Sequence, residues 1–295
     1  MQLLVFVLAY PFLWAISILP NSLFYGFSNV LFFILYRLAG YRKATVRKNL
    51  ELVFPKRSAE ERKTIEVKFY RHLCDLFLEM VKTMSLSEKA VKRKYHVLNM
   101  EVLNTIEKRK SIIIACAHYA NWEWNVSLSN YSTSKGYAIY QKIGNKYFDR
   151  HMKRIRSKWN TTLLNQKETI PEVLRNHRDN VRAVYGMVND QSPMAGSARY
   201  WTEFMGIKVP VFMGVENLAR KLDLAVVFLK VSKVKRGHYN AEFIPITEAG
   251  KATEKHEITN TFLRLTERQI RERPELYLWT HRRWKHRNKV PKEFQ

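Results

Sequence analysis

Two histidines in this chain are each followed, five positions later, by a carboxylate: His118 by Glu123 and His96 by Glu101. A carboxylate that accepts a hydrogen bond from one imidazole nitrogen fixes the tautomer and raises the basicity of the other nitrogen. Such a pair can act as a general base toward a hydroxyl or an amine. Five residues of an ideal helix turn by roughly 500°, which leaves the two side chains about 140° apart. The pair therefore meets only where the histidine lies in a turn and the acid in the first turn of the following helix.

The surrounding residues distinguish the two pairs. His118 directly follows the apolar run 112–117, which is typical of a buried parallel strand. His96 follows the basic stretch Lys92-Arg93-Lys94, so this histidine and Glu101 are predicted to be solvated surface residues. We therefore take His118 and Glu123 as the candidate catalytic pair. The alternative is a core histidine that is capped by a nearby carboxylate.

The motifs that the chain lacks limit what this base can do. There is no GxSxG, GxxxxGK[ST], GxGxxG or HExxH sequence, so hydrolase, kinase, dinucleotide and zinc-protease interpretations lack their parts. Neither Cys74 nor Cys116 has metal or disulfide spacing, and no metal or cofactor is implied. The proton must then come from a substrate, which favours direct attack of a substrate hydroxyl on an activated acyl group. Cys116, two residues before His118, is the alternative nucleophile, and we expect it to be an inert core residue.

Alternating helices and strands must position these residues. Ser58 and Glu61 form a capping box, and apolar residues recur every four positions, so residues 58–83 are predicted to be an amphipathic helix. Further strands are predicted at residues 137–143, 182–188, 224–231 and 239–246, and further helices at 146–159, 169–177, 215–222 and 256–273. This order predicts an α/β fold with an open, largely parallel sheet flanked by helices. Sites in such sheets collect at the carboxyl ends of the strands, where His118 is predicted to lie.

The N-terminal segment differs in composition from the rest of the chain. Residues 1–36 contain no Asp, Glu, Lys or Arg, and two apolar runs at 3–19 and 23–36 are separated by Pro20-Asn21-Ser22. We expect residues 1–40 to be an N-terminal membrane anchor and residues 41–295 to be one catalytic domain. The lengths are compatible with a spanning helix, a kinked pair or an in-plane anchor. The alternative is a hairpin buried in the core of the protein.

The charge of the chain points to its partners. The 295 residues include 51 basic and 26 acidic side chains, a net charge of +25. Basic residues directly after the apolar segment predict that the body lies on the cytoplasmic face of a membrane. The excess charge suits an anionic membrane surface or an acidic protein. A nucleic-acid-binding protein is the alternative from another class, but it leaves the uncharged segment unexplained, so we expect no nucleic-acid partner.

The sequence HYANWE at 118–123 resembles the H-x-G-N-W-E signature of the late acyltransferases of lipid A biosynthesis, the lauroyl and myristoyl transferases. This family lies within the lysophospholipid acyltransferase group that shares H-x4-[DE]. Four further blocks are similar to the family in the same order, and the resemblance covers nearly the whole chain. They are Arg47-Lys48-Asn49-Leu50, Asn145-x3-Asp149-x6-Arg156, Asp190-Gln191 with Phe204-Met205-Gly206, and Pro274-Glu275-x3-Trp279-x-His281-Arg282-Arg283-Trp284.

The resemblance implies a role for each matching residue. His118 would be the base and Glu123 its orienting acid, and Arg156 would contact a phosphate or polarise the thioester carbonyl. Asp190, Gln191 and Asn121 would bind substrate; Asp190-Gln191 and Phe204-Met205-Gly206 resemble the block that lines the acyl or headgroup cleft. The donor would be an acyl carrier protein and the acceptor a phosphorylated glycolipid, at the cytoplasmic face of a bacterial inner membrane.

Two positions depart from the family pattern, and the acceptor has alternatives. Ala120 stands where the family usually has glycine, so the turn must tolerate a Cβ, and Asn160 stands where glycine is frequent. Neither departure removes a reacting group. Because H-x4-E reports the reaction and not the acceptor, a lysophospholipid or an amino-acid lipid is the alternative acceptor.

Overall fold

The structure is a computed structural model that describes residues 1–294. Within this range, seven strands form one curled sheet in the order β1-β9-β8-β2-β5-β3-β4, and two strands form a separate hairpin. The strands of the large sheet are β1 (Tyr95–Val97), β2 (Ile112–Cys116), β3 (Lys135–Tyr140), β4 (Thr161–Asn165), β5 (Ala183–Val188), β8 (Ala225–Lys235) and β9 (His238–Thr247), and those of the hairpin are β6 (Trp201–Phe204) and β7 (Ile207–Pro210). Neighbours in the large sheet are parallel except for β8 and β9. The predicted α/β fold with a largely parallel sheet is confirmed.

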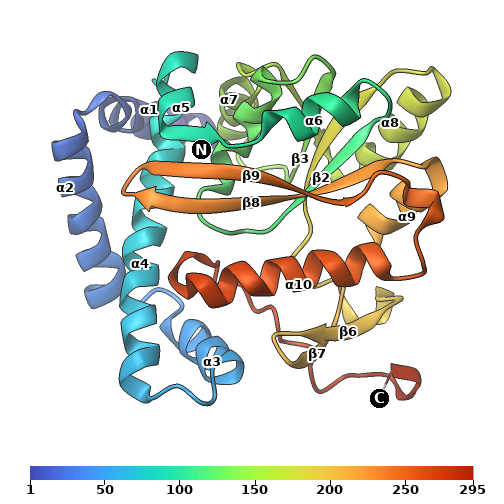
Figure 1. The fold of residues 1–295 in the computed structure, drawn as a ribbon. Helices are drawn as coiled ribbons and strands as arrows, with labels where there is room; N and C mark the ends of the chain where they lie inside the picture. The colour runs from blue at the N-terminus through green and yellow to red at the C-terminus, as the bar shows by residue number, and fades with distance from the viewer. Residues whose placement is uncertain (295) are drawn as a thin grey trace.

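Helices cover the sheet on both sides. The α-helices are α1 (Gln2–Ile18), α2 (Asn21–Phe32), α3 (Lys43–Val53), α4 (Ala59–Lys82), α5 (Glu88–Lys94), α6 (Met100–Glu107), α7 (Lys146–Ser157), α8 (Gln166–Arg178), α9 (Gly214–Leu222) and α10 (Glu257–Glu272). Short helical segments are the π-helix η1 (Phe33–Leu38) and the 3-10 turns η2 (Trp122–Asn130), η3 (Ala195–Ser197), η4 (Gly250–Ala252), η5 (Pro274–Leu276) and η6 (Lys292–Phe294). In Figure 1, α10 runs below the sheet and α6, α7 and α8 lie above it.

Helix α4 forms where the capping box and the apolar spacing predict it. The Ser58 hydroxyl accepts a hydrogen bond from Glu61 N at 3.1 Å, and the Glu61 carboxylate accepts one from Ser58 N at 2.7 Å. Phe69 and Leu73 are buried as expected, whereas Phe77 is 38% exposed. The helix also buries polar side chains that the apolar spacing did not predict: Glu66, His72, Asp75 and Glu79.

The other predicted elements of the body are present, with ends displaced by at most four residues. The largest displacement is in β8, which ends at Lys235 and not at residue 231. Four strands were not predicted, β1, β4, β6 and β7, and they are three to five residues long. Such segments are too short to show a periodicity of their own.

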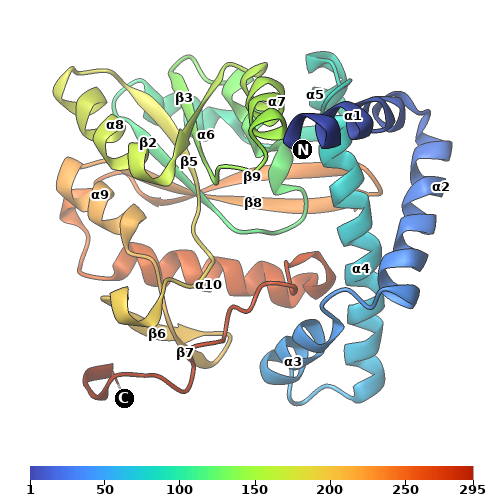
Figure 2. The same cartoon turned by 180° about the vertical axis from the view of Figure 1, so that it is seen from behind.

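The apolar N-terminal segment forms two helices that pack on the body and expose apolar side chains. Figure 2 shows α1 beside α7 and α2 alongside α4. Phe6 of α1 contacts Phe148 of α7 with ring centroids 5.1 Å apart. Leu8, Phe12 and Leu23 remain more than half exposed, so the alternative of a hairpin buried in the core is wrong. Among the described helices, none by itself has the length and apolar composition to cross a membrane. One pair of consecutive helices, Asn21–Leu38 with Lys43–Val53, has that length and composition when the two are taken together, and the pair is bent by 86°.

Candidate active site

The candidate base lies beyond the carboxyl end of β2, a central strand. β2 and β5 are parallel neighbours, with Cys116 opposite Val188. The chain reaches His118 two residues after the first strand and Asp190 two residues after the second, so this register brings the two side chains together. Asp190 Oδ1 accepts hydrogen bonds from His118 N at 3.1 Å and from His118 Nδ1 at 2.7 Å. The hydrogen bond that we expected His118 to donate to Glu123 is therefore donated to Asp190.

The charges around His118 favour one tautomer of its neutral ring. Burial disfavours the protonated ring, but the charge and hydrogen bond of Asp190, together with Glu123, raise the pKa of His118 above its ordinary value. Burial also disfavours the Asp190 carboxylate, yet His118 and the buried Arg283 guanidinium keep the pKa of Asp190 below its ordinary value. Asp190 thus stays ionised near neutral pH and holds the proton on Nδ1. The basic nitrogen of the neutral ring is then Nε2.

Gln191 and Trp122 surround the ring of His118. With the proton on Nδ1, the Gln191 amide donates to His118 Nε2 at 3.3 Å. The Trp122 indole meets the ring edge-on, with centroids 5.3 Å apart. The His118 side chain is 20% exposed, so a substrate can approach it.

Glu123 pairs with Arg156 and not with His118. Arg156 comes from the last turn of α7, and its guanidinium donates a hydrogen bond to Glu123 Oε2 at 2.6 Å. Both side chains are more than four-fifths buried and line the same cavity as His118. An arginine held beside a general base can donate hydrogen bonds to a carbonyl that develops negative charge or to a phosphate.

A cavity of about 570 Å³ adjoins these side chains. This volume lies within the range of small-molecule sites. The polar lining residues His118 and Gln191 follow the carboxyl ends of their strands, whereas residues from the strands themselves supply an apolar wall. That wall includes Ile114, Ala138, Leu163, Val184, Gly186 and Met187. The arrangement can place a long apolar chain along the sheet with its reactive end beside His118. Among residues 1–294, no group of three or more His, Cys, Asp or Glu side chains is positioned to hold a metal ion.

Asn121, which we expected to bind substrate, is instead fully buried and does not line this cavity. Its Oδ1 accepts a hydrogen bond from Trp124 N at 3.1 Å and so caps η2, and its Nδ2 donates to Glu79 Oε2 at 2.7 Å. Glu123, two residues after Asn121 in the chain, does line the cavity. Asn121 therefore shapes the turn between His118 and Glu123.

Residues of two other blocks of the sequence pattern also stabilise the local fold. Asn145 caps α7 by accepting a hydrogen bond from Tyr147 N at 3.0 Å, and Asp149 accepts one from Ile143 N at 2.9 Å. The stretch 204–206 forms the turn of the β6–β7 hairpin, with its second and third residues in the left-handed region, and it does not line the cavity described above.

Cys116 lines the cavity but is a poor nucleophile. Burial raises the pKa of its thiol to about 12. Asn125 Nδ2 donates a hydrogen bond to Cys116 Sγ at 3.4 Å. The thiol is therefore protonated near neutral pH.

Sequence reasoning missed the orienting role of Asp190 and the buried groups around it. Tyr277 and Arg283 are at most 2% exposed, and Arg283 donates hydrogen bonds to Ser192 Oγ at 2.9 Å and to Pro210 O at 3.1 Å. Asp190 follows an apolar strand at the same offset as His118, and this equal spacing is the signal that could have paired them.

Comparison with known proteins identifies the family. The sequence profile described as "Bacterial lipid A biosynthesis acyltransferase" matches residues 2–286, nearly the whole chain. The chain belongs to this family. Among similar proteins of the lipid A acyltransferase family are two of Escherichia coli (strain K12). The lipid A biosynthesis palmitoleoyltransferase is 23% identical over 256 residues, covering 83% of this chain and 79% of the relative. The lipid A biosynthesis lauroyltransferase is 23% identical over 278 residues, covering 93% and 89%.

The structure explains both departures from the pattern of the lipid A acyltransferases. Ala120 has φ 51° and Asn160 has φ 58°, so both lie in the left-handed region that favours glycine. Asparagine visits this region more readily than most residues, and alanine has only a methyl group to accommodate. The backbone that a glycine would adopt is therefore kept at both positions.

Proposed function

We propose that this lipid A acyltransferase moves a fatty acyl group from the thioester of an acyl carrier protein to a hydroxyl group of a phosphorylated lipid A precursor. His118 is the general base. The observation that carries the proposal is the hydrogen bond between His118 and Asp190 beside a largely apolar cavity. One ring nitrogen is held by a carboxylate, and the other can take a proton next to space for an acyl chain.

The reaction proceeds by direct attack. The acceptor hydroxyl displaces the Gln191 amide from His118 Nε2 and gives its proton to that nitrogen, while its oxygen attacks the thioester carbonyl. A C–O bond forms, the C–S bond breaks, and His118 returns the proton to the departing thiolate. Asp190 holds Nδ1–H and stabilises the imidazolium between these two proton transfers. Arg156, oriented by Glu123, donates hydrogen bonds to the developing oxyanion or to a phosphate of the acceptor.

The N-terminal helices support a site that works at a lipid surface. Apolar side chains of α1 and α2 are exposed, and α1 packs directly on α7, the helix that carries Arg156. In-plane insertion of these helices places the cavity beside the bilayer. The net charge of +25 favours a phosphorylated lipid and an acidic carrier protein as partners. On this proposal the enzyme acts at the cytoplasmic face of a bacterial inner membrane.

The test is an acyl-transfer assay with purified full-length protein, carrier-protein thioesters of several chain lengths and a lipid A precursor, with the product read by mass spectrometry. His118→Ala should lower turnover by roughly 10²- to 10⁴-fold, the usual contribution of a general base. His96→Ala is the matched control, since His96 lies exposed on β1, and it should be close to neutral.

Retention of more than about a tenth of wild-type turnover by His118→Ala would contradict the mechanism. Lipid mass spectrometry of a strain that lacks the protein tests the acceptor. Loss of an acyl chain from lipid A supports the proposal, and loss from a phospholipid or an amino-acid lipid overturns it.

A further inference from the structure

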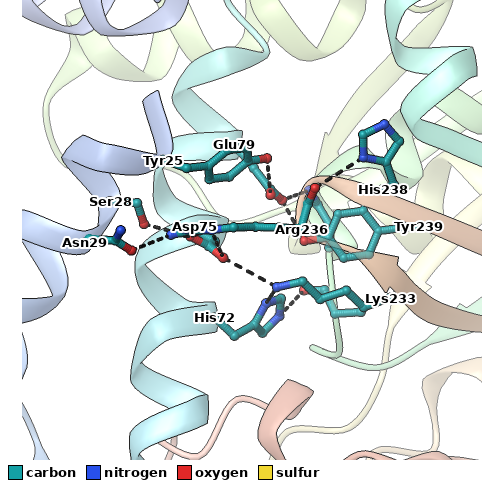
Figure 3. Close-up of polar contacts among 12 residues, drawn as sticks. Tyr25, Ser28, Asn29, His72, Asp75, Glu79, Lys233, Arg236, His238 and Tyr239 are labelled. Atoms are coloured by element: carbon teal, nitrogen blue, oxygen red, sulfur yellow. Dashed lines mark hydrogen bonds and ion pairs between the residues drawn. The ribbon is translucent and has the colours of Figure 1, made fainter. Parts of the chain in front are cut away.

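A polar cluster outside the cavity, whose carboxylates are buried and whose Asn29 is exposed, joins the N-terminal helices to the turn that carries His118. Figure 3 shows its members on three parts of the fold: Tyr25, Ser28 and Asn29 of α2, His72, Asp75 and Glu79 of α4, and Lys233, Arg236 and Tyr239 of the β8–β9 region. None of these side chains lines the cavity. A buried polar group is costly unless it is hydrogen bonded, so such a cluster calls for an explanation.

Glu79 is the member that contacts both the turn and helix α2. It is fully buried, and its Oε2 accepts hydrogen bonds from Asn121 Nδ2 at 2.7 Å and from the Tyr239 hydroxyl at 2.8 Å. Its backbone oxygen accepts a hydrogen bond from the Trp124 indole at 3.3 Å. The Oε1 atom accepts a hydrogen bond from the Tyr25 hydroxyl of α2 at 3.0 Å. One carboxylate thus holds both the catalytic turn and a helix of the apolar N-terminal segment.

His72 contacts the turn and Asp75 contacts α2, but neither contacts both. Asp75 pairs with Arg236 at 2.6 Å and with Lys233 at 3.4 Å, and it accepts a hydrogen bond from Ser28 at 2.7 Å. Lys233 Nζ lies 3.3 Å from His72 Nδ1, so His72 Nε2 donates to Ala120 O at 3.2 Å. Because Asp75 carries the ion pairs, Glu79 serves chiefly as a hydrogen-bond acceptor.

The turn needs such support because of its own geometry. Ala120 lies in the left-handed region, which costs an L-residue about 1–2 kcal/mol, so local preferences do not maintain it. His118 and Glu123 lie at its two ends, and Asn121 lies between them. A shift of about 1 Å at a reacting group can lower a rate by roughly 10²-fold.

We propose that Glu79 is a positioning residue of the transfer reaction. It fixes the turn between His118 and Glu123 through Asn121, and it fixes the same turn to helix α2 through Tyr25. This inference rests on the proposed function for its kinetic test, and a second measurement below does not depend on it.

The kinetic test compares Glu79→Leu with Glu66→Leu. Glu66 is the matched control, since it is a buried carboxylate on the same helix whose hydrogen bonds go to Tyr36 at 2.9 Å, Arg47 at 2.9 Å and Lys63 at 3.2 Å rather than to the turn. Glu79→Leu should lower kcat about tenfold to a hundredfold with little change in KM, because Glu79 does not touch the cavity. Glu66→Leu should lower Tm but leave kcat unchanged. A kcat within twofold of wild type in folded Glu79→Leu would overturn the proposal.

Exchanging the donor and the acceptor of the hydrogen bond between Asn121 and Glu79 tests this contact even if Glu79→Leu does not fold. Asn121→Asp keeps the cap on Trp124 N but sets two carboxylates against each other, and it should lose activity. Adding Glu79→Gln places an amide donor opposite the new carboxylate and restores the number of buried charges. Burial raises the pKa of Glu79 to about 7, so a neutral group at this position is a mild change. The double variant should regain at least a tenth of wild-type kcat, and a double variant no more active than Asn121→Asp alone refutes the pairing.

Hydrogen exchange separates this inference from the proposed function, since it needs no substrate. In Glu79→Leu, or in Asn121→Asp if the former does not fold, amide exchange in a peptide covering residues 118–130 should be faster than in wild type. It should return toward the wild-type rate in the double variant and stay unchanged in Glu66→Leu. If wild-type protein transfers no acyl group from a carrier-protein thioester to a lipid A precursor, the proposed function fails while this comparison still decides the positioning role. Equal exchange in all variants would show that Glu79 does not fix the turn.

Discussion

The sequence pattern predicts that Glu123 orients His118, whereas in the structure Asp190 contacts His118 and Glu123 contacts Arg156. Asp190 holds Nδ1 of the ring at 2.7 Å, and Glu123 holds Arg156 at 2.6 Å while adding negative charge near the base. A buried acid that orients the ring and a partly exposed acid that orients a cation should respond differently to substitution. The pH dependence of the reaction tells them apart.

Asp190→Asn should lower kcat by at least about 10²-fold and move the acid limb of activity to lower pH. The base works only when His118 is neutral, so activity falls as pH drops through the pKa of His118. Asp190 raises that pKa, and loss of its charge lowers it, so the neutral ring then persists to lower pH. The measurement is kcat/KM against pH for wild type, Asp190→Asn and Glu123→Gln. An unchanged acid limb in Asp190→Asn would show that Asp190 does not set the protonation of His118.

Cys116→Ala should retain most activity, although Cys116 lines the cavity. Its thiol has a pKa of about 12, so the nucleophilic thiolate is scarce near neutral pH. The check is turnover of the variant together with incubation of wild type with labelled acyl carrier protein alone, which should leave the enzyme unlabelled. A hydroxylamine-sensitive acyl adduct that disappears in Cys116→Ala would instead establish an acyl-enzyme.

At the level of elements, strands and helices with clear periodicity were predictable, but the order of the strands in the sheet was not. The runs that became β2 and β5 were both predicted from sequence. Their parallel pairing was not, because strand order depends on contacts between distant segments that a local pattern does not contain. For this reason Asp190 was predicted as a substrate ligand and not as the partner of His118.

The polar cluster on α4 escaped prediction for a related physical reason. Hydropathy assigns Asp75 and Glu79 to a solvated face, and only the arrival of α2 and the β8–β9 strands supplies the partners that let them be buried. Asn121 was assigned to substrate from the family resemblance, and a local pattern does not reveal its partner Glu79, which lies 42 positions earlier in the chain. Buried polar contacts between remote elements are the part of this site that a sequence pattern alone does not reveal.

The middle of β5 offers a test of where the acyl chain lies. Gly186 lines the cavity, and a Cβ there would meet only Tyr137 O at 3.6 Å, an ordinary contact. Gly186→Met should therefore fold and fill part of the cavity. Transfer from long-chain thioesters should fall about tenfold or more, while shorter chains are affected less, since about 0.8 kcal/mol is lost per methylene that stays exposed.

The control for this substitution is Gly196→Met, because Gly196 has open space around it and does not line the cavity. Competition between thioesters of different length in one reaction gives the selectivity directly. An unchanged chain-length profile in Gly186→Met would place the acyl chain elsewhere.

At the scale of the whole molecule, the exposed apolar faces of α1 and α2 should hold the enzyme on a lipid surface. Leu8 is 61% exposed and Phe12 is 72% exposed. Replacing both with lysine should leave Tm nearly unchanged, because little buried area is lost. Binding to vesicles should weaken about tenfold or more, since each buried apolar side chain contributes about 1.5–3 kcal/mol.

Flotation with vesicles at high salt measures this binding without the contribution of net charge. Val234→Lys is the matched control, because Val234 is 61% exposed on β8 in the body of the protein. Equal loss of binding in the control and in the α1 variant would mean that α1 is not the membrane-contacting surface.

His118 and Asp190 are separated by 72 positions in sequence and by 2.7 Å in space. The intervening segment therefore begins and ends at the same point of the fold, and it contains η2, β3, α7, β4, α8 and β5, which supply most of the cavity wall. Residues of this closed segment other than Glu123 and Arg156 can diverge without separating His118 from Asp190. Under the proposed function, the cavity wall that would contact the acyl chain can then change while the His118–Asp190 contact is kept.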